Sequence, residues 1–362
     1  MFPRILFSML AISLPALAPA AGAESVVETK YIDSVVLRDN LIGLQTRRSL
    51  KVYLPPGYAQ GQDRYPMIYL LHSLNWSNER MFAPGTAAQP TFDRAIARGV
   101  IPPFIAVAPD YTTSGPGSFF ADSPVSGRFE EFTLREVVPF IDANYRTLAG
   151  AASRGITGDQ LGAYGAMRYA FRHPDVFGAV YGMHPYGSGA GIVPMQSRPD
   201  WSRIHAAKSY ADLAGNPYSP VFVAMAQVFL PNPQRPPFYC DFLVEPRDGR
   251  LETDAKHVLL LKSRFFLEQI AEQNLDNLRK LRGIKFDWGR YDPNPDHVHS
   301  NLIFTRKLDE LGIEHEAEEF RGLPWDQYWI DEGRVYTEVL PFFSRRLEWG
   351  HSSFSLSRIG GS

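Results

Sequence analysis

The sequence of 362 residues contains a single cysteine, Cys240, so no disulfide can form within the chain. Stability must therefore come from a packed core, which a hydrophobic content of 44% can supply. No sequence typical of a nucleophilic thiol surrounds Cys240, and we expect it to be a small packed side chain. Net charge is also scarce: a formal charge of −2 gives no electrostatic reason to expect nucleic acid or an anionic membrane as a partner.

Long hydrophobic runs are missing after the first 23 residues, so the sequence predicts no transmembrane anchor. Residues 1–23 combine one basic residue, Arg4, with a short apolar run and small residues at its end. This pattern is typical of a secretory signal peptide, with cleavage expected before Glu24. We therefore expect an exported protein, either periplasmic or secreted.

Strand-like runs alternate with helical segments along most of the remaining chain. Residues 65–73 and 104–110 are continuous apolar runs, as expected for strands covered on both faces. Residues 130–145 repeat apolar side chains at helical spacing, and a further helix is expected at 161–172. This alternation predicts an α/β protein with a mostly parallel sheet and helices on both faces, and with a ligand site beyond the carboxyl ends of the strands.

The alternation breaks between Pro185 and about Leu281. The stretch is rich in proline at first and reads as helical from Ala255 to Leu281. We interpret residues 185–281 as an insertion that covers the active-site edge, not as a second domain. The prediction is thus a single domain over residues 24–350, followed by a frayed tail at 351–362.

With these elements placed, the chain resembles the esterase D, antigen 85 and feruloyl esterase group of α/β-hydrolases, the broad "putative esterase" family. The resemblance rests on "VYLPPGY", "YPMIYLLHS", "RGITGDQLGAYGAMRYAFRHPDVFGAVYG", "DWGRYD" and "LPFFSRRL", which follow the family's order between about residues 45 and 347. It implies an α/β-hydrolase fold with a lid-like insertion. It also implies a carboxylic-ester hydrolase or acyltransferase activity that uses a serine, a histidine and an acid, with no cofactor.

The nucleophile position of this family falls in "GITGDQLGAYGA". Gly158 and Gly162 permit a sharp turn from strand to helix, but Gln160 stands between them where the family has serine. A glutamine amide carries no proton whose removal yields a good attacking group. The neighbouring Asp159 is more simply explained as a turn-stabilising or paired carboxylate than as a nucleophile.

The general base position is also substituted. After the last strand the family has a glycine closely followed by histidine, whereas this sequence reads "RGLPWDQYW", with Leu323 and Trp325 after the glycine. The acid is retained at Asp292, with Asp296 as the alternative. The absence of both serine and histidine from an otherwise complete framework predicts that the serine mechanism is lost.

Several groups at the same edge are candidates for binding a ligand. The helix after the elbow begins with free backbone N–H groups, and the loop after residue 72 supplies another donor in the family. Gln160 itself could hydrogen-bond a ligand or only fill its space. We predict ligand contacts from Ser73, Leu74, Asn75, Trp76, Asp159, Leu161 and Trp325.

The histidines offer two further hypotheses. His184 closes the strand after the elbow helix, so it is a candidate substitute base beside Gln160. A metal site using His184, His297, His299 and Asp296 is the less favoured alternative, and we predict neither metal nor cofactor. We expect His72 to support the loop after its strand and His173 to contact a helix C-terminus.

The aromatic side chains on the expected loops could stack on a sugar or aryl ring, but packing is favoured for each. These are Trp76, Tyr111, Phe119, Phe120, Trp325, Tyr328 and Trp329.

Three functions remain open from the sequence. The favoured one is a catalytically degenerate esterase that binds a small molecule, such as an acylated sugar or aryl ester, or a partner. The second is an enzyme with altered chemistry built on Gln160, His184 and Asp292. The third is a carboxylic-ester hydrolase acting on acylated carbohydrates or aryl esters, which needs a nucleophile that the sequence does not reveal.

Overall fold

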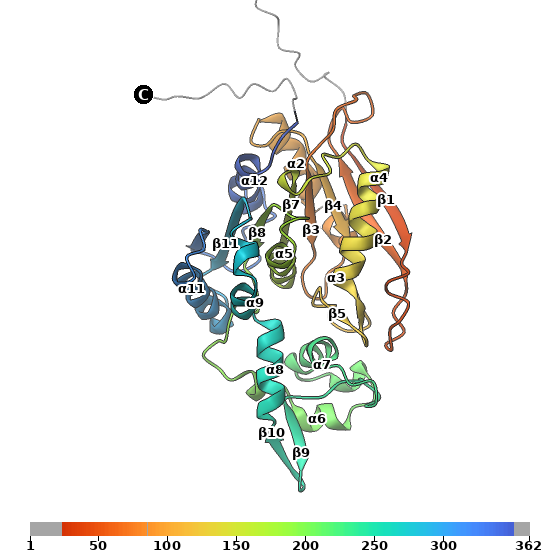
Figure 1. Ribbon diagram of the computed structural model, residues 1–362, viewed down its shortest axis with the longest axis vertical. Helices are drawn as coiled ribbons and strands as arrows, with labels where there is room; N and C mark the ends of the chain where they lie inside the picture. Colours follow the sequence, from red (N-terminus) through yellow and green to blue (C-terminus); the bar gives the residue numbers. More distant parts are fainter. Residues whose placement is uncertain (1–23, 85, 351–362) are drawn as a thin grey trace, which may run out of the picture.

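The computed structural model describes residues 24–84 and 86–350, so the predicted signal peptide and tail lie outside the described residues. Its centre is an eight-stranded sheet with the order β1-β2-β4-β3-β7-β8-β11-β12 (Figure 1). The bounds are β1 Val26–Asp33, β2 Arg47–Leu54, β3 Met67–Leu71, β4 Ile105–Pro109, β7 Arg154–Asp159, β8 Ala179–Met183, β11 Gly283–Gly289 and β12 Glu316–Phe320. The pairs β1–β2 and β2–β4 are antiparallel, and the other neighbours are parallel.

Strand β3 shows how the sequence dictates a sheet covered on both faces. Met67, Tyr69 and Leu71 belong to the core on one side of the sheet. Ile68 and Leu70 belong to the core on the other side. Because successive strand side chains point to opposite faces, an unbroken apolar run requires helices above and below.

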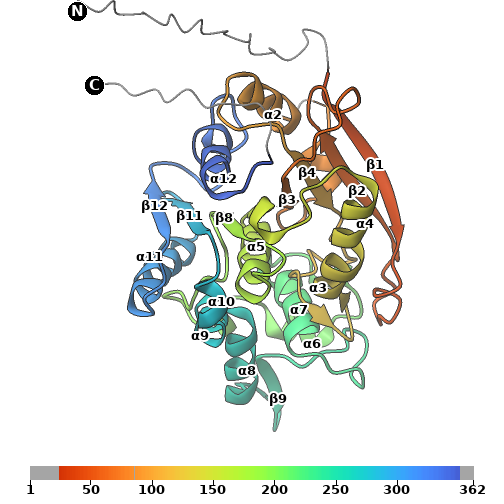
Figure 2. The ribbon, with the colours of Figure 1, turned by 45° about the horizontal axis from the view of Figure 1, so that its top comes forward.

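The two helical layers meet this requirement (Figure 2). Side chains of α3, α4, α5 and α11 join the core on one face, and those of α2 and α12 join the core on the other. The bounds are α2 Ala88–Ala97, α3 Phe129–Glu131, α4 Val138–Asn144, α5 Leu161–Arg172, α11 Pro295–Glu310 and α12 Leu340–Arg346. Helix α5 has the predicted limits, and the predicted helix at 130–145 is formed by α3, a π-helical segment at Phe132–Val137, and α4.

Most of the predicted insertion lies beyond one end of the sheet (Figure 1), whereas its last two short helices pack against α5. Its elements are α6 Trp201–Ala206, α7 Tyr218–Phe229, the hairpin β9 Val244–Arg247 and β10 Arg250–Thr253, α8 Ala255–Phe265, α9 Leu267–Gln273 and α10 Leu275–Leu278. The prediction of continuous helix from Ala255 to Leu281 is wrong, because extended backbone at Phe266 separates α8 from α9. Helix α7 was not predicted because this stretch is rich in proline. Pro220 nevertheless fits in its first turn, where a backbone N–H has no helical partner.

Cys240 is 1% exposed and belongs to the core, which confirms the prediction of a small packed side chain. Within residues 24–84 and 86–350, no helix has both the length and the apolar character needed to cross a membrane.

Candidate functional site

The turn from β7 to α5 places Gln160 at the carboxyl edge of the sheet. Gln160 has φ 53° and ψ −110°, a backbone conformation that crowds any residue with a side chain. Gly162 is required beside it, because a Cβ there would overlap the backbone oxygen of Leu71. A Cβ on Gly158 would overlap the backbone of Gly162. The turn therefore has the tight strand-to-helix geometry expected of a nucleophile elbow, with glutamine at its tip.

The side chain of Gln160 is held by the loop after β3. Ser73 Oγ donates a hydrogen bond of 2.7 Å to Gln160 Oε1. His72 fixes the loop: its Nε2 accepts from the Tyr111 backbone N–H at 3.0 Å, so its proton lies on Nδ1 and is donated to Ser73 O, also at 3.0 Å. These bonds agree with the supporting role expected for His72.

Asp292, just beyond β11, lies between two histidines. Its Oδ2 is 2.8 Å from His184 Nε2 and 2.8 Å from His297 Nδ1, and its Oδ1 accepts from the backbone N–H of Asn294 at 2.7 Å. Burial disfavours the charged carboxylate, but the bonds from His184 and His297 outweigh it and hold the pKa of Asp292 well below its usual range. The carboxylate therefore stays ionised.

His184 is fully buried, and both of its ring nitrogens are occupied. The backbone N–H of Gly289 donates to Nδ1 at 2.9 Å, so the proton of the neutral ring lies on Nε2 and is donated to Asp292. Burial lowers the pKa of His184, and the bond to Asp292 only partly opposes this. His184 thus holds Asp292 in place. Its role as a substitute base stays a prediction, and both of its ring nitrogens are already engaged in hydrogen bonds.

The same bonds bear on the metal alternative. One potential ligand atom from each of His184, Asp292 and His297 lies within 4.8 Å of the others. A metal at His184 Nε2 would need a lone pair there, but Gly289 donates to the opposite nitrogen and leaves the proton on Nε2. Metal-bound histidines ordinarily donate from their second nitrogen, whereas this one accepts. The donor set fits a hydrogen-bonded cluster rather than a metal centre.

The segment after β12 passes the expected place of the family's histidine without supplying one. The Tyr291 backbone N–H donates to Gly322 O at 3.0 Å, so this segment runs beside the end of β11. Leu323 follows and is half-buried, while Trp325 is 54% exposed. An aliphatic side chain therefore stands where the resemblance leads us to expect the base.

Asp287 anchors the same segment to the sheet. Its fully buried carboxylate accepts bonds of 2.7 Å from Tyr181 Oη, Tyr328 Oη and Arg334 Nε. Tyr328 and Arg334 both lie in the stretch after Leu323, so hydrogen bonds to a buried carboxylate fix the path of this loop.

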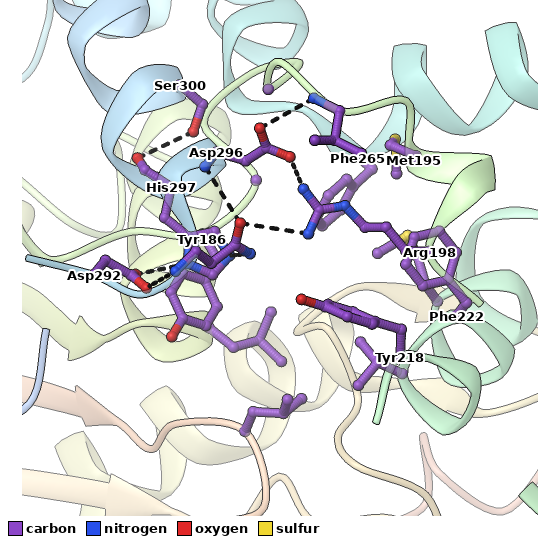
Figure 3. Close-up of a pocket in the computed structure, with 18 of the residues that line it drawn as sticks. Tyr186, Met195, Arg198, Tyr218, Phe222, Phe265, Asp292, Asp296, His297 and Ser300 are labelled. Carbon is purple, nitrogen blue, oxygen red and sulfur yellow. Dashed lines mark hydrogen bonds and ion pairs between the residues drawn. The ribbon is translucent and has the colours of Figure 1, made fainter. Parts of the chain in front are cut away.

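A pocket of about 400 Å³ opens beside the Asp292 cluster (Figure 3). Leu74, Leu161, Asp292 and His297 line it from the sheet side. Much of the remaining wall is apolar and aromatic and comes from the insertion. These residues include Tyr186, Met195, Tyr218, Phe222, Met225 and Phe265.

An ion pair crosses this pocket between the insertion and α11 (Figure 3). Arg198 pairs with Asp296 at the start of α11. Asp296 Oδ1 also accepts from the backbone N–H groups of Ile192 at 2.7 Å and Val193 at 3.1 Å. Asp296, the alternative acid position, therefore ties the insertion to α11, and the charges of Arg198 and Asp296 cancel each other.

The predicted ligand contacts divide into two groups. Leu74, Leu161 and Trp325 line the pocket. Ser73, Asn75, Trp76 and Asp159 do not line it. Trp76 instead lies under the Arg80 guanidinium at 4.0 Å.

Asp159 stands directly before the elbow tip and remains partly accessible to solvent. Loss of hydration raises the pKa of Asp159 to about 7.

Packing, as expected, accounts for most of the loop aromatics. Tyr111, Phe120 and Tyr328 are buried in the core. Phe119 is buried as well but contributes to the pocket wall. His173 ends α5 as expected, and its Nε2 lies 2.6 Å from Glu130 Oε1.

The insertion side of the pocket, including Tyr186, Arg198 and Tyr218, was not predicted from the sequence. His297 was predicted only as a possible metal ligand. The available signals were the aromatics within the proline-rich stretch and a histidine placed shortly after the acid.

Comparison with known proteins identifies the family. Residues 43–224, about half of the chain, match the family described as "Putative esterase", and the chain belongs to it. This match contains the elbow and ends before Asp292. An endo-1,4-beta-xylanase/feruloyl esterase of Xylanibacter ruminicola is 33% identical over 141 residues, which cover 36% of this chain and 18% of that protein. The similarity thus spans under a fifth of that relative.

Solved structures establish the α/β-hydrolase fold. A ferulic acid esterase aligns with a TM-score of 0.61 at 20% identity, covering 90% of this chain and 99% of that one. A ferulic acid esterase from Anaeromyces mucronatus in complex with ferulic acid aligns with a TM-score of 0.50 at 14% identity, covering 93% and 98%. The predicted fold class is therefore confirmed.

Proposed function

We propose that this chain binds a small aryl or acyl ligand and does not hydrolyse esters by the serine mechanism of its family. The observation that carries this proposal is Gln160, which occupies the tip of an intact elbow with its side chain bonded to Ser73. Leu323 at the expected base position adds to it, because neither half of a serine–histidine pair is present.

The walls of the pocket support the ligand class. Phe222, Phe265 and Tyr218 supply aromatic surface, and the paired charges of Arg198 and Asp296 do not favour a strongly charged ligand. A volume of about 400 Å³ suits a small organic molecule. The complex of the Anaeromyces mucronatus esterase with ferulic acid gives a first compound to test. Export to the periplasm or beyond, expected from residues 1–23, is part of the same proposal.

Binding and labelling test the two parts of the proposal. We expect calorimetry to detect binding of the neutral methyl ester of ferulic acid, and we expect binding to weaken about tenfold in Phe222→Ala, since burial against an aromatic wall contributes about 1.4 kcal/mol or more. Tyr31→Ala, an exposed change on β1, is the matched control.

A fluorophosphonate probe with mass mapping tests the mechanism. We expect no adduct on any serine of the wild type. The double variant Gln160→Ser with Leu323→His is the comparison, because it rebuilds the family's pair on the same backbone. A serine adduct on the wild type, together with ester turnover that the probe abolishes, would overturn the proposal.

A further inference from the structure

His297 differs from His184 in lining the pocket and in being partly exposed. Its Nδ1 is 2.8 Å from Asp292 Oδ2, and its Nε2 is 3.0 Å from the side-chain nitrogen of Asn294 (Figure 3 shows His297 and Asp292). Both His297 and Asn294 line the pocket, and the His297 side chain is 23% exposed. The Tyr186 ring stacks on the imidazole with centroids 3.9 Å apart.

These contacts define the protonation of the ring. Because the Asn294 amide donates to Nε2, the proton of neutral His297 lies on Nδ1 and points at the ionised Asp292. The basic lone pair is then on Nε2, beside the pocket. A carboxylate on Nδ1–H, with the basic lone pair on Nε2, is the arrangement of a general base and its orienting acid.

His184 completes the support for this pair. It donates to the same carboxylate oxygen, and Gly289 prevents it from changing tautomer. Asp292 therefore cannot rotate without breaking bonds to His184 and to the backbone of Asn294. His184 and Asp292 are positioning residues in this arrangement, and His297 is the group that faces a ligand.

We propose that His297 is the general base of a serine-independent ester hydrolysis in this pocket. The inference rests on the ligand pocket of the proposed function and adds an activity to it. Water attacks the acyl carbon of the bound ester while His297 Nε2 takes one of its protons, and the carboxylate of Asp292 stabilises the imidazolium. The tetrahedral intermediate then breaks its bond to the alcohol oxygen, which takes the proton back from Nε2. The net change is ester plus water to acid plus alcohol.

The pocket also defines the substrate class. The lining is mostly apolar, and the charges of Arg198 and Asp296 are paired with each other. A neutral ester with an aryl or short alkyl body therefore fits best. Such a substrate must displace the Asn294 amide from Nε2, or bind a water molecule in its place, before the base can act.

Hydrolysis of 4-nitrophenyl acetate by the whole protein tests the inference. Since a positioned base contributes about 10²–10⁴-fold, His297→Gln should lower kcat at least about 100-fold with little change in KM. Asp292→Asn should lower kcat as well. His299→Gln, a change two residues further along α11 and outside the pocket lining, should leave the rate unchanged. Added imidazole should restore part of the rate of His297→Ala, which a merely structural role would not allow.

The outcomes separate this inference from the proposed function. The activity should survive fluorophosphonate treatment. His297→Gln should keep its thermal midpoint, and its binding of the methyl ester of ferulic acid should stay within about twofold of the wild type. No turnover above buffer in the wild type, or equal rates in wild type and His297→Gln, overturns the inference and leaves the ligand-binding proposal standing. Loss of the rate on fluorophosphonate treatment overturns both.

Discussion

The tip of the elbow offers a direct test of how this turn is built. Gln160 has φ 53° and ψ −110°, and holding a residue with a side chain in such a region costs on the order of 1–3 kcal/mol. Glycine removes that cost, whereas alanine keeps it. Both substitutions delete the 2.7 Å bond from Ser73 Oγ, so the difference between them isolates the backbone.

The magnitude follows from two opposing effects. Relief of strain favours Gln160→Gly, while the greater freedom of glycine in the unfolded chain opposes it by roughly 0.5–1 kcal/mol. Gln160→Gly should therefore be more stable than Gln160→Ala by about 1 kcal/mol. Loss of the Ser73 bond, about 1 kcal/mol in each, should leave the glycine variant near the wild type and the alanine variant below it.

Urea unfolding with equal m values measures this difference. The control is Arg306, an exposed residue inside α11, where glycine should be less stable than alanine by about 1 kcal/mol. The order of the two variants should therefore reverse between the elbow and the helix. A Gln160→Gly protein no more stable than Gln160→Ala would refute the assignment of strain to the turn.

Three further changes test the framework around the site. The hydrogen-bond and charge partners of Glu130 outweigh its burial and lower its pKa from 4.5 to about 2. Its ionised carboxylate therefore contributes about 3 kcal/mol to the free energy of unfolding above pH 4.5, and this contribution is lost as the pH falls toward 2. Glu130→Gln should lose that contribution at pH 7 and flatten the acid limb of urea unfolding, and an unchanged limb would contradict this. Gly162→Ala should cost about 3 kcal/mol by overlap at the elbow, whereas Gly150→Ala, with nothing within 4 Å, should stay within about 0.5 kcal/mol. Asp287→Asn should cost about 3 kcal/mol by leaving Arg334 without its buried charge partner, and thermal unfolding with no change would exclude that role.

The parts of the fold that the sequence predicted are those determined by local patterns. The limits of α5 follow from the glycine turn before Leu161 and the basic end at Arg172. The apolar run at 65–73 predicts a buried strand because both faces of β3 must be covered. The glycines at 158 and 162 are also a local pattern, and they place Gln160 at the elbow.

The pocket could not be predicted in this way because its walls come from distant segments. Tyr186, Arg198 and Tyr218 are brought to the sheet edge only by the packing of the insertion, whose helix α7 is masked by prolines. The roles of His184 and His297 depend on which ring nitrogen meets which donor. Tertiary contacts determine these hydrogen bonds, and they cannot be predicted from the spacing of residues in the sequence.

The need to stabilise the carboxylate of Asp292 explains why the cluster contains two histidines. A nearly buried carboxylate without partners is costly, and Leu323 provides none to Asp292 from the segment where the family's histidine is expected. His184 and His297 supply that compensation from other elements, and together they keep Asp292 ionised. Asp292 therefore orients a histidine that lies on α11 and lines the insertion pocket. The proposed ester hydrolysis should then depend on His297 and Asp292 and be indifferent to the serines of the protein.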